Sequence, residues 1–321
     1  MGSSATVMEV RRDTAGGASR GLVGFAWAVV AYNVLVVLWG ALVRATGSGA
    51  GCGNHWPLCN GQVIPINPTL HTVIEFTHRM MTGGSGFVVM GLLVWTLRGT
   101  MKGQAARVFA VASMLLLLNE AFLGMLLVKL GYVTSNQSVG RVIVLGIHFS
   151  NTLLLLGALT LTALMLKTGQ RWSAIMSSKG QGQGRGVVLL GLAATLVVGV
   201  SGSMAALGDT LFPAATLAEA IAQDFAAASP WLLRVRWVHP ASAVVAALFV
   251  VWIVAGTGWQ RSRWVVGLLV FQFALGFGDI LLLAPAWLQI VHLLGADLYW
   301  IALLTLAAQR WSGSSGQFAT V

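Results

Sequence analysis

Four of the six histidines in this sequence lie inside long apolar stretches. His78, His148, His239 and His292 fall in the second, fourth, sixth and eighth of these stretches, one in each. A lone histidine in an apolar helix is often a hydrogen-bonding packing residue. Polar groups in hydrocarbon are costly, however, and often functional. The recurrence in alternate stretches therefore favours two pairs of ligands over four unrelated packing residues.

Haem is the group that best suits such pairs. Its macrocycle leaves two axial positions on the iron, and histidines from facing helices of a bundle fill them. Zinc or a dinuclear centre needs further carboxylates or thiolates close by. Glu75 is the only acid that we expect near any of the four histidines. The sequence predicts two haem-sized sites, one in each half of the chain.

Glu75 precedes His78 by three residues, so both side chains share one face of a helix. Arg79 lies about 100° around the same helix. At the matching position before His239 the chain has Arg236, so only the first half carries the acid. Glu75 is either a proton acceptor or charge stabiliser beside a reacting group, or the partner of Arg79 or another cation at the helix start. The first interpretation makes the first half the reactive one.

The two cysteines lie together in the segment "GCGNHWPLC" between the first two apolar stretches. Cys52 and Cys59 are separated by a Gly- and Pro-bearing loop that allows their sulfurs to meet. Because the topology below places this loop outside the cell, we expect a disulfide. It is either a structural bridge or a redox-active pair that exchanges with an incoming dithiol. His55, between them, is expected to be an ordinary loop residue.

The composition indicates an all-α integral membrane protein. Of the 321 residues 57% are hydrophobic and only 9% are charged. The net charge of +10 is spread along the chain, so no basic patch follows a phosphate backbone and no nucleic-acid partner is expected. Eight transmembrane helices in the lipid bilayer are predicted, over residues 22–43, 72–97, 108–131, 142–166, 187–207, 235–256, 264–284 and 287–308.

The distribution of Lys and Arg sets the expected orientation. Thirteen fall on the side of the chain ends and five on the other, so both termini are expected in the cytoplasm. Each of the four histidines then follows the start of its helix by about five or six residues, roughly 8 to 10 Å below the outer surface. Arg44 and Arg79 lie close enough to that surface to bind haem propionates or lipid headgroups.

The segment "SSKGQGQGRG" divides the chain into two pseudo-symmetric four-helix bundles. A Leu-Gly pair that recurs at Gly124 and Gly276 supports an internal repeat. The expected parts are an N-terminal tail (1–21), a first bundle with the substrate site (22–176), an outer cysteine loop within it (44–71), a linker (177–186), a second bundle with the cofactor site (187–308) and a C-terminal tail (309–321).

A short surface helix is predicted between the fifth and sixth spans. Thr216 and Glu219 form a capping-box pattern. Leu217, Ile221 and Phe225 then recur every four residues, as in a helix that lies on the membrane surface.

The motif "LVRATGSGAGCGNHWPLCNG", followed by "IEFTHR" and by one histidine in each even-numbered span, resembles the bacterial haem A synthases. The resemblance covers all eight spans. Members of that family often have an acid before the Trp-Pro of the loop, where this chain has His55. The resemblance implies oxidation of a methyl group of haem O to a formyl group by successive hydroxylations with oxygen from water, giving haem A for terminal oxidases.

The resemblance also implies roles for the site residues. The histidines of the first half flank the substrate haem, with Glu75 essential beside it. His239 and His292 bind a haem b cofactor, and the Cys52–Cys59 disulfide aids haem transfer or electron flow. Expected partners are a haem O synthase, terminal oxidase assembly proteins and an unidentified electron acceptor. The expected location is the bacterial inner membrane, with the haem sites near its outer face.

Two other functions are compatible with parts of this pattern. A di-haem membrane cytochrome that carries electrons from a quinol also uses pairs of histidines. It commonly places its haems near both membrane surfaces, whereas these histidines are expected at one depth. A transporter built from repeats would use Glu75 as a proton site.

Overall fold

Eight long helices form the protein in a computed structural model that describes residues 17–177 and 182–312. All eight are long and apolar enough to cross a membrane, which confirms the predicted all-α, multi-pass membrane protein. They are α1 (Arg20–Ala45), α2 (Leu70–Gly99), α3 (Ala105–Lys129), α4 (Val139–Thr168), α6 (Gly182–Leu211), α9 (Val238–Ala255), α10 (Trp259–Leu281) and α11 (Ala286–Ser312).

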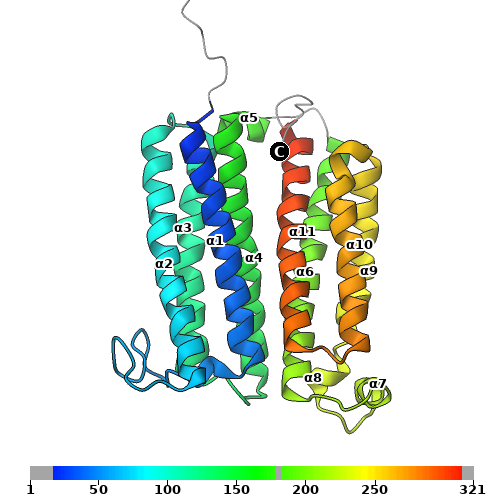
Figure 1. Ribbon diagram of the computed structural model, residues 1–321. Helices are drawn as coiled ribbons and strands as arrows, with labels where there is room; N and C mark the ends of the chain where they lie inside the picture. The colour runs from blue at the N-terminus through cyan, green and yellow to red at the C-terminus, as the bar shows by residue number, and fades with distance from the viewer. Residues whose placement is uncertain (1–16, 178–181, 313–321) are drawn as a thin grey trace, which may run out of the picture.

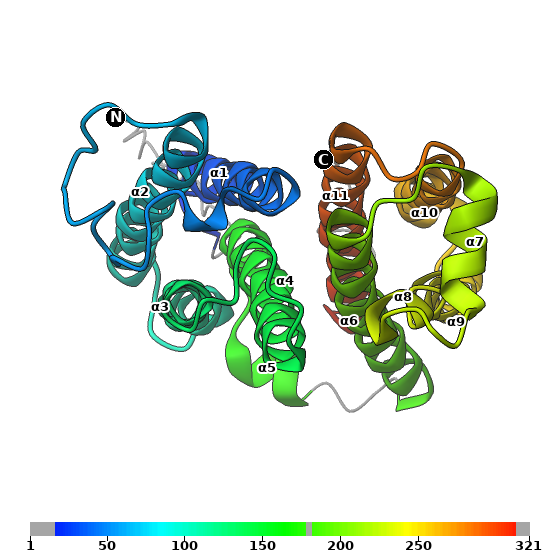
Figure 2. The ribbon, with the colours of Figure 1, turned by 90° about the horizontal axis from the view of Figure 1, so that it is seen from below.

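The long helices form two groups of four. Helices α1 to α4 pack together, and α6, α9, α10 and α11 form a second group beside them (Figures 1 and 2). The two groups meet where α1 and α4 pack against α6 and α11. There the Trp300 indole donates a buried hydrogen bond to the Leu153 carbonyl at 2.7 Å. The relative position of the two groups therefore depends on side-chain packing as well as on the short connection between them.

Helix caps account for the early starts of three of the long helices. The side chains of Ser19, Thr69 and Ser138 each accept a hydrogen bond from a backbone N–H three residues later. Such caps satisfy donors that the first helical turn leaves free. They begin α1, α2 and α4 two or three residues before the apolar stretches themselves begin.

The helix of the sixth span begins later than predicted, whereas the helices above begin earlier. α9 begins only at Val238, after a separate turn of helix, α8 (Trp231–Arg234). Pro240 lies in the first turn of α9, where a proline suits a helix start. His239 is thus the second residue of its helix. The predicted offset of five or six residues holds for His292 but is wrong for the other three histidines, because their helices start at other residues than predicted.

The described residues also include a 3-10 turn (Ser48–Ala50) and two further short helices. α5 (Trp172–Ser177) was not predicted, and it packs Trp172 edge-on against Phe109 with ring centroids 5.8 Å apart. The predicted surface helix is confirmed as α7 (Leu217–Phe225), capped by the Thr216 hydroxyl, which accepts from the Glu219 N–H. The Glu219 carboxylate accepts in return from Ala215 rather than from Thr216.

Both ends of the described chain lie at the same end of the molecule. α1 begins and α11 ends there, while the cysteine loop and α7 lie at the opposite end (Figure 1). Residues 178–181 of the predicted linker, and most of both predicted tails, lie outside the described residues. α6 begins at Gly182, so that helix includes the last residues of the predicted linker.

Candidate functional site

Each of the four histidines lies against a glycine of the preceding long helix. Because glycine has no side chain, the imidazole can approach the neighbouring backbone closely. A methyl group added to Gly40, Gly124, Gly202 or Gly276 would lie 3.2, 3.9, 2.8 or 3.4 Å from Cε1 of His78, His148, His239 or His292, respectively. A glycine–histidine contact therefore occurs twice in each group of four helices. It is too tight for an added methyl group at Gly40 and Gly202, and of ordinary van der Waals length at Gly124 and Gly276.

The glycines also place the histidines along the molecule. Gly40, Gly124 and Gly276 each lie five residues before the last residue of their helix, roughly 7 to 8 Å along the axis. Those helices end on the side of the cysteine loop and α7. Gly202 lies nine residues before the end of the longer α6. Three of the four histidines are thus equally far from the ends of the helices that they pack against. The number of residues between each histidine and the start of its own helix nevertheless differs.

The two histidines of the second group face one another. Their ring centroids are 6.3 Å apart and their planes are nearly perpendicular, at 82°. A metal ion about 2 Å from one nitrogen of each ring separates two such centroids by roughly 6 Å. The His239 Nδ1 lies 3.2 Å from the Val198 carbonyl, which requires it to donate and leaves Nε2 free as a ligand. The His292 Nδ1 is buried without a hydrogen-bond partner.

The first group pairs its histidines in a more polar setting. The His78 Nδ1 is buried without a hydrogen-bond partner. The His148 Nδ1 lies 3.4 Å from a carboxylate oxygen of Glu120, within ion-pair range but not aligned as a hydrogen bond. The expectation that Glu75 is the only acid near a histidine is therefore wrong. Glu120 has the same signal in the sequence, a carboxylate inside a span.

No other side chains complete a metal site around these histidines. Among residues 17–177 and 182–312, no three His, Cys, Asp or Glu side chains come close enough together to hold a metal ion. Each pair offers two axial ligands, and a porphyrin brings the remaining ones. The spacing of the second pair and the orphaned imidazole nitrogens fit a haem.

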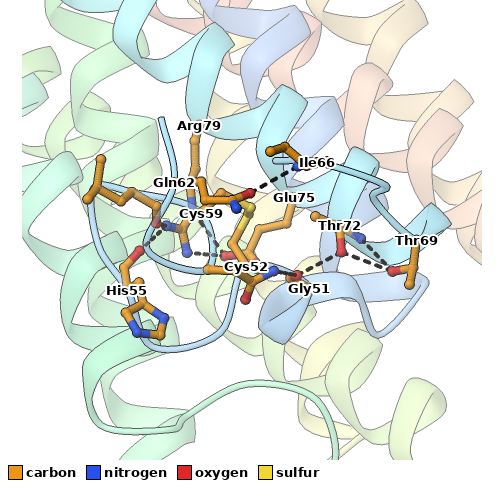
Figure 3. Close-up of a disulfide and its surroundings, with 12 residues drawn as sticks. Gly51, Cys52, His55, Cys59, Gln62, Ile66, Thr69, Thr72, Glu75 and Arg79 are labelled. Carbon is orange, nitrogen blue, oxygen red and sulfur yellow. Dashed lines mark hydrogen bonds and ion pairs between the residues drawn. A yellow bond between two sulfur atoms is a disulfide. The ribbon is translucent and has the colours of Figure 1, made fainter. Parts of the chain in front are cut away.

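Glu75 is buried against the cysteine loop, with 4% of its surface exposed. Its carboxylate accepts a 2.7 Å hydrogen bond from the Cys52 N–H and forms an ion pair with Arg79 (Figure 3). The Arg79 Nε also donates to it at 3.1 Å. These contacts match the ion-pair interpretation of Glu75, and its role beside a reacting group stays a prediction.

Arg79 fastens the cysteine loop to α2 one residue after His78. Its guanidinium donates to the backbone carbonyls of His55 and Leu58 at 2.7 and 2.6 Å, inside the loop closed by the cysteines. The predicted disulfide between Cys52 and Cys59 is confirmed, and both cysteines are buried. Figure 3 shows that Glu75 binds the loop at Cys52 and that Arg79 binds it at His55.

Arg236 precedes His239 by three residues, just as Glu75 precedes His78. It donates to Asp209 of α6 at 2.7 Å and to Asp224 of α7 at 2.8 Å. The surface helix is thereby tied to the long helices beside a candidate ligand. Three residues before the first histidine of each group, the first group thus has an acid that binds the cysteine loop, and the second has a base that binds α7.

Arg44 joins the two groups of helices. Its guanidinium donates to the Ala206 carbonyl and the Thr210 hydroxyl of α6, both at 2.7 Å, and to the Gln289 amide oxygen of α11 at 2.8 Å. Both arginines expected at haem propionates thus bind protein groups here, and contact with a propionate stays a prediction for each.

Comparison with known proteins gives the family. Residues 24–304 match the family COX15-CtaA, described as cytochrome oxidase assembly protein. The chain belongs to this family. The matched part of the chain includes all four histidines, Glu75 and both cysteines.

Individual relatives match over different lengths. A Thermus thermophilus protein named Protoheme IX farnesyltransferase is 41% identical over 294 residues, which are 89% of this chain and 48% of that protein. The Heme A synthase of Geobacillus kaustophilus is 37% identical over 156 residues, 48% of this chain and 47% of its own. That of an Exiguobacterium species is 32% identical over 146 residues, 46% of each. The chain spans about half the length of the curated relatives it matches.

Proposed function

We propose that this assembly protein is a haem A synthase, which oxidises a methyl group of haem O to a formyl group. The observation that carries the proposal is the pair of glycine-seated histidines in each group of four helices. Membership of an oxidase assembly family and relatives named Heme A synthase support it. The farnesyltransferase name is not carried over, because residues 24–304 match the cytochrome oxidase assembly family.

In this proposal His78 and His148 hold the substrate haem in the first group. The polar surroundings of this pair support the assignment, because a reaction that moves protons and electrons needs charged groups nearby. Glu75 and Glu120 lie close to these two histidines in sequence or space, whereas the second pair has no acid recorded within ion-pair distance in the described chain.

Glu75 acts beside the substrate. The Cys52 N–H and Arg79 stabilise its charged form, so it presents a fixed carboxylate one helical turn from His78. Such a group stabilises positive charge on a carbon that loses electrons, or accepts the proton of an attacking water. Oxygen comes from water in successive hydroxylations, and the electrons leave to an acceptor outside this chain.

His239 and His292 bind a haem b cofactor, which contributes one-electron redox chemistry when bound. The chain contributes the facing imidazoles, one fixed by the Val198 carbonyl, and glycine seats that let the rings approach. The second group has no counterpart of Glu75, because the residue three positions before His239 is Arg236. Its function is then to carry electrons rather than to react with a substrate.

The disulfide loop completes the first site, where it assists haem transfer or electron flow. We place the ends of the described chain on the cytoplasmic side of a bacterial inner membrane, so that the loop and both haem sites lie near the outer face. The repeated glycine–histidine contacts support two pseudo-symmetric bundles. Haem O synthase and terminal oxidase assembly proteins are the proposed partners, as supplier and recipients.

A Glu75→Gln variant tests the reactive role. Loss of the carboxylate should lower haem A formation by at least about 100-fold. Glu219→Gln, which changes an acid of the surface helix outside the histidine pairs, should leave the rate unchanged. Haem A made at the normal rate by Glu75→Gln protein would remove Glu75 from the mechanism.

Haem spectra test the ligands. A His239→Ala His292→Ala double variant should lose the low-spin haem b signal, and retention of that signal would contradict this assignment. The alternative, a di-haem cytochrome that only transfers electrons, predicts bound haem that is never oxidised at a methyl group. The relatives named Heme A synthase favour the synthase over this alternative.

A further inference from the structure

The carboxylate of Glu120, in the middle of α3, lies near His148, but the function proposed above gives it no specific role. We propose that Glu120 is a positioning residue for His148, which makes the first iron site favour ferric iron more strongly than the second. The inference rests on the proposed function, because it takes His148 to be an iron ligand.

Hydrogen bonds from α4 fix the Glu120 carboxylate. The Asn151 amide donates to one of its oxygens at 2.6 Å, and the Thr152 hydroxyl donates to the other. Asn151 also donates to the Leu116 carbonyl and accepts from Asn119, so it cannot turn away. The donors follow His148 directly on the next turn of its own helix. The carboxylate is therefore held in one place relative to the imidazole, 3.4 Å from Nδ1.

The second group lacks this arrangement at the matching positions. Gly124 and Gly276 contact the second histidine of each pair, and the residues four before them are Glu120 and Gln272. The residues three and four after the histidines are Asn151 and Thr152 in α4, but Gly295 and Ala296 in α11. Gln272 packs against Gly295, and its amide nitrogen is buried without a partner. A carboxylate with a hydrogen bond to each oxygen in one half thus corresponds to an amide whose nitrogen has no partner in the other.

The physical consequence follows from the position of the charge. Carboxylates that face the free ring nitrogen of a ligating histidine fix its orientation and increase its basicity as a ligand. A negative charge beside the ligand also stabilises ferric over ferrous iron, and such groups set haem reduction potentials. The first haem should therefore have the lower potential of the two, and Glu120 should account for part of the difference.

The test is a spectroelectrochemical titration of purified full-length protein loaded with haem b as the probe. We expect Glu120→Gln to weaken the preference of the first-group haem for the ferric state about tenfold, a rise of about 59 mV for a one-electron couple. The second-group haem should keep its potential. The reverse change, Gln272→Glu, should lower the potential of the second-group haem and leave the first unchanged.

A Thr152→Val variant distinguishes the effect of the Glu120 charge from the effect of its hydrogen bonds on stability. It removes one hydrogen bond to the carboxylate but keeps the charge, so the potential should move less than in Glu120→Gln even if thermal stability falls equally. If Glu120→Gln lowers the melting temperature without moving the potential, Glu120 is only structural and the inference fails. If Glu120→Gln does not fold, Gln272→Glu decides alone, since an unmoved second potential overturns the charge argument.

Failure of the proposed function has a different signature. A His148→Ala variant should lose the first-group haem signal. If that signal persists, His148 is not a ligand and the haem assignment itself is wrong, whatever Glu120→Gln does. If the signal is lost in His148→Ala and unshifted in Glu120→Gln, only the positioning role of Glu120 is wrong.

Discussion

Replacement of Gly202 by alanine should weaken haem binding in the second group of helices. The added methyl group would lie 2.8 Å from Cε1 and 3.1 Å from Nδ1 of His239, closer than packed atoms come. The ring cannot move freely, because its Nδ1 bonds the Val198 carbonyl and its other side faces His292. Overpacking of this kind costs about 1 to 3 kcal/mol. If that strain falls on the bound state, haem b binds roughly 5- to 160-fold more weakly.

Gly124→Ala is the matched control. Its methyl group would lie 3.9 Å from Cε1 of His148, an ordinary contact, and alanine favours a helix over glycine by about 1 kcal/mol. The assay is haem b retained per protein after purification, with the low-spin absorption spectrum. Gly202→Ala should lose haem while Gly124→Ala keeps it. Equal retention and unchanged spectra in both variants would refute the claim that glycines seat the histidines.

Two further predictions concern the surface segments. Cys59→Ser opens a disulfide that links residues seven apart, so the free energy of unfolding should fall by about 2 kcal/mol in thermal or denaturant unfolding, and an unchanged value would contradict the loop's structural contribution. Arg236→Gln removes charge-assisted bonds to Asp209 and Asp224, so amide hydrogen exchange in Leu217–Phe225 should quicken at least about tenfold, while the exposed Arg234→Gln should not change it.

The architecture could be predicted from the sequence because hydrocarbon imposes a strong pattern. Every long helix coincides with an apolar stretch, and the surface helix is marked by its cap and its four-residue repeat. Helix starts were less predictable, since they depend on caps such as Ser19 and Thr69 beyond the apolar residues. At His239 the helix start depends on Pro240 and on the separate turn before it.

Some residues of the candidate site were predicted from the sequence, but Glu120 and most of the contacts between the site residues were not. The four histidines and the disulfide follow from residue type and spacing. The ion pair of Glu75 with Arg79 could also be anticipated, because the two residues lie four apart on one helix. The bond from the Cys52 N–H could not, because it depends on how the loop folds back onto α2. The approach of Glu120 to His148 depends on the packing of α3 against α4. Tertiary contacts of this kind leave no periodic trace in one sequence.

Pigment analysis tests the central claim most directly. The full-length protein would be expressed with and without a haem O supplier, purified, and its extracted haems identified by mass. The proposed function predicts haem A only when haem O is supplied and Glu75 is intact. Haem O recovered unchanged from folded protein that contains both haems would contradict a haem A synthase.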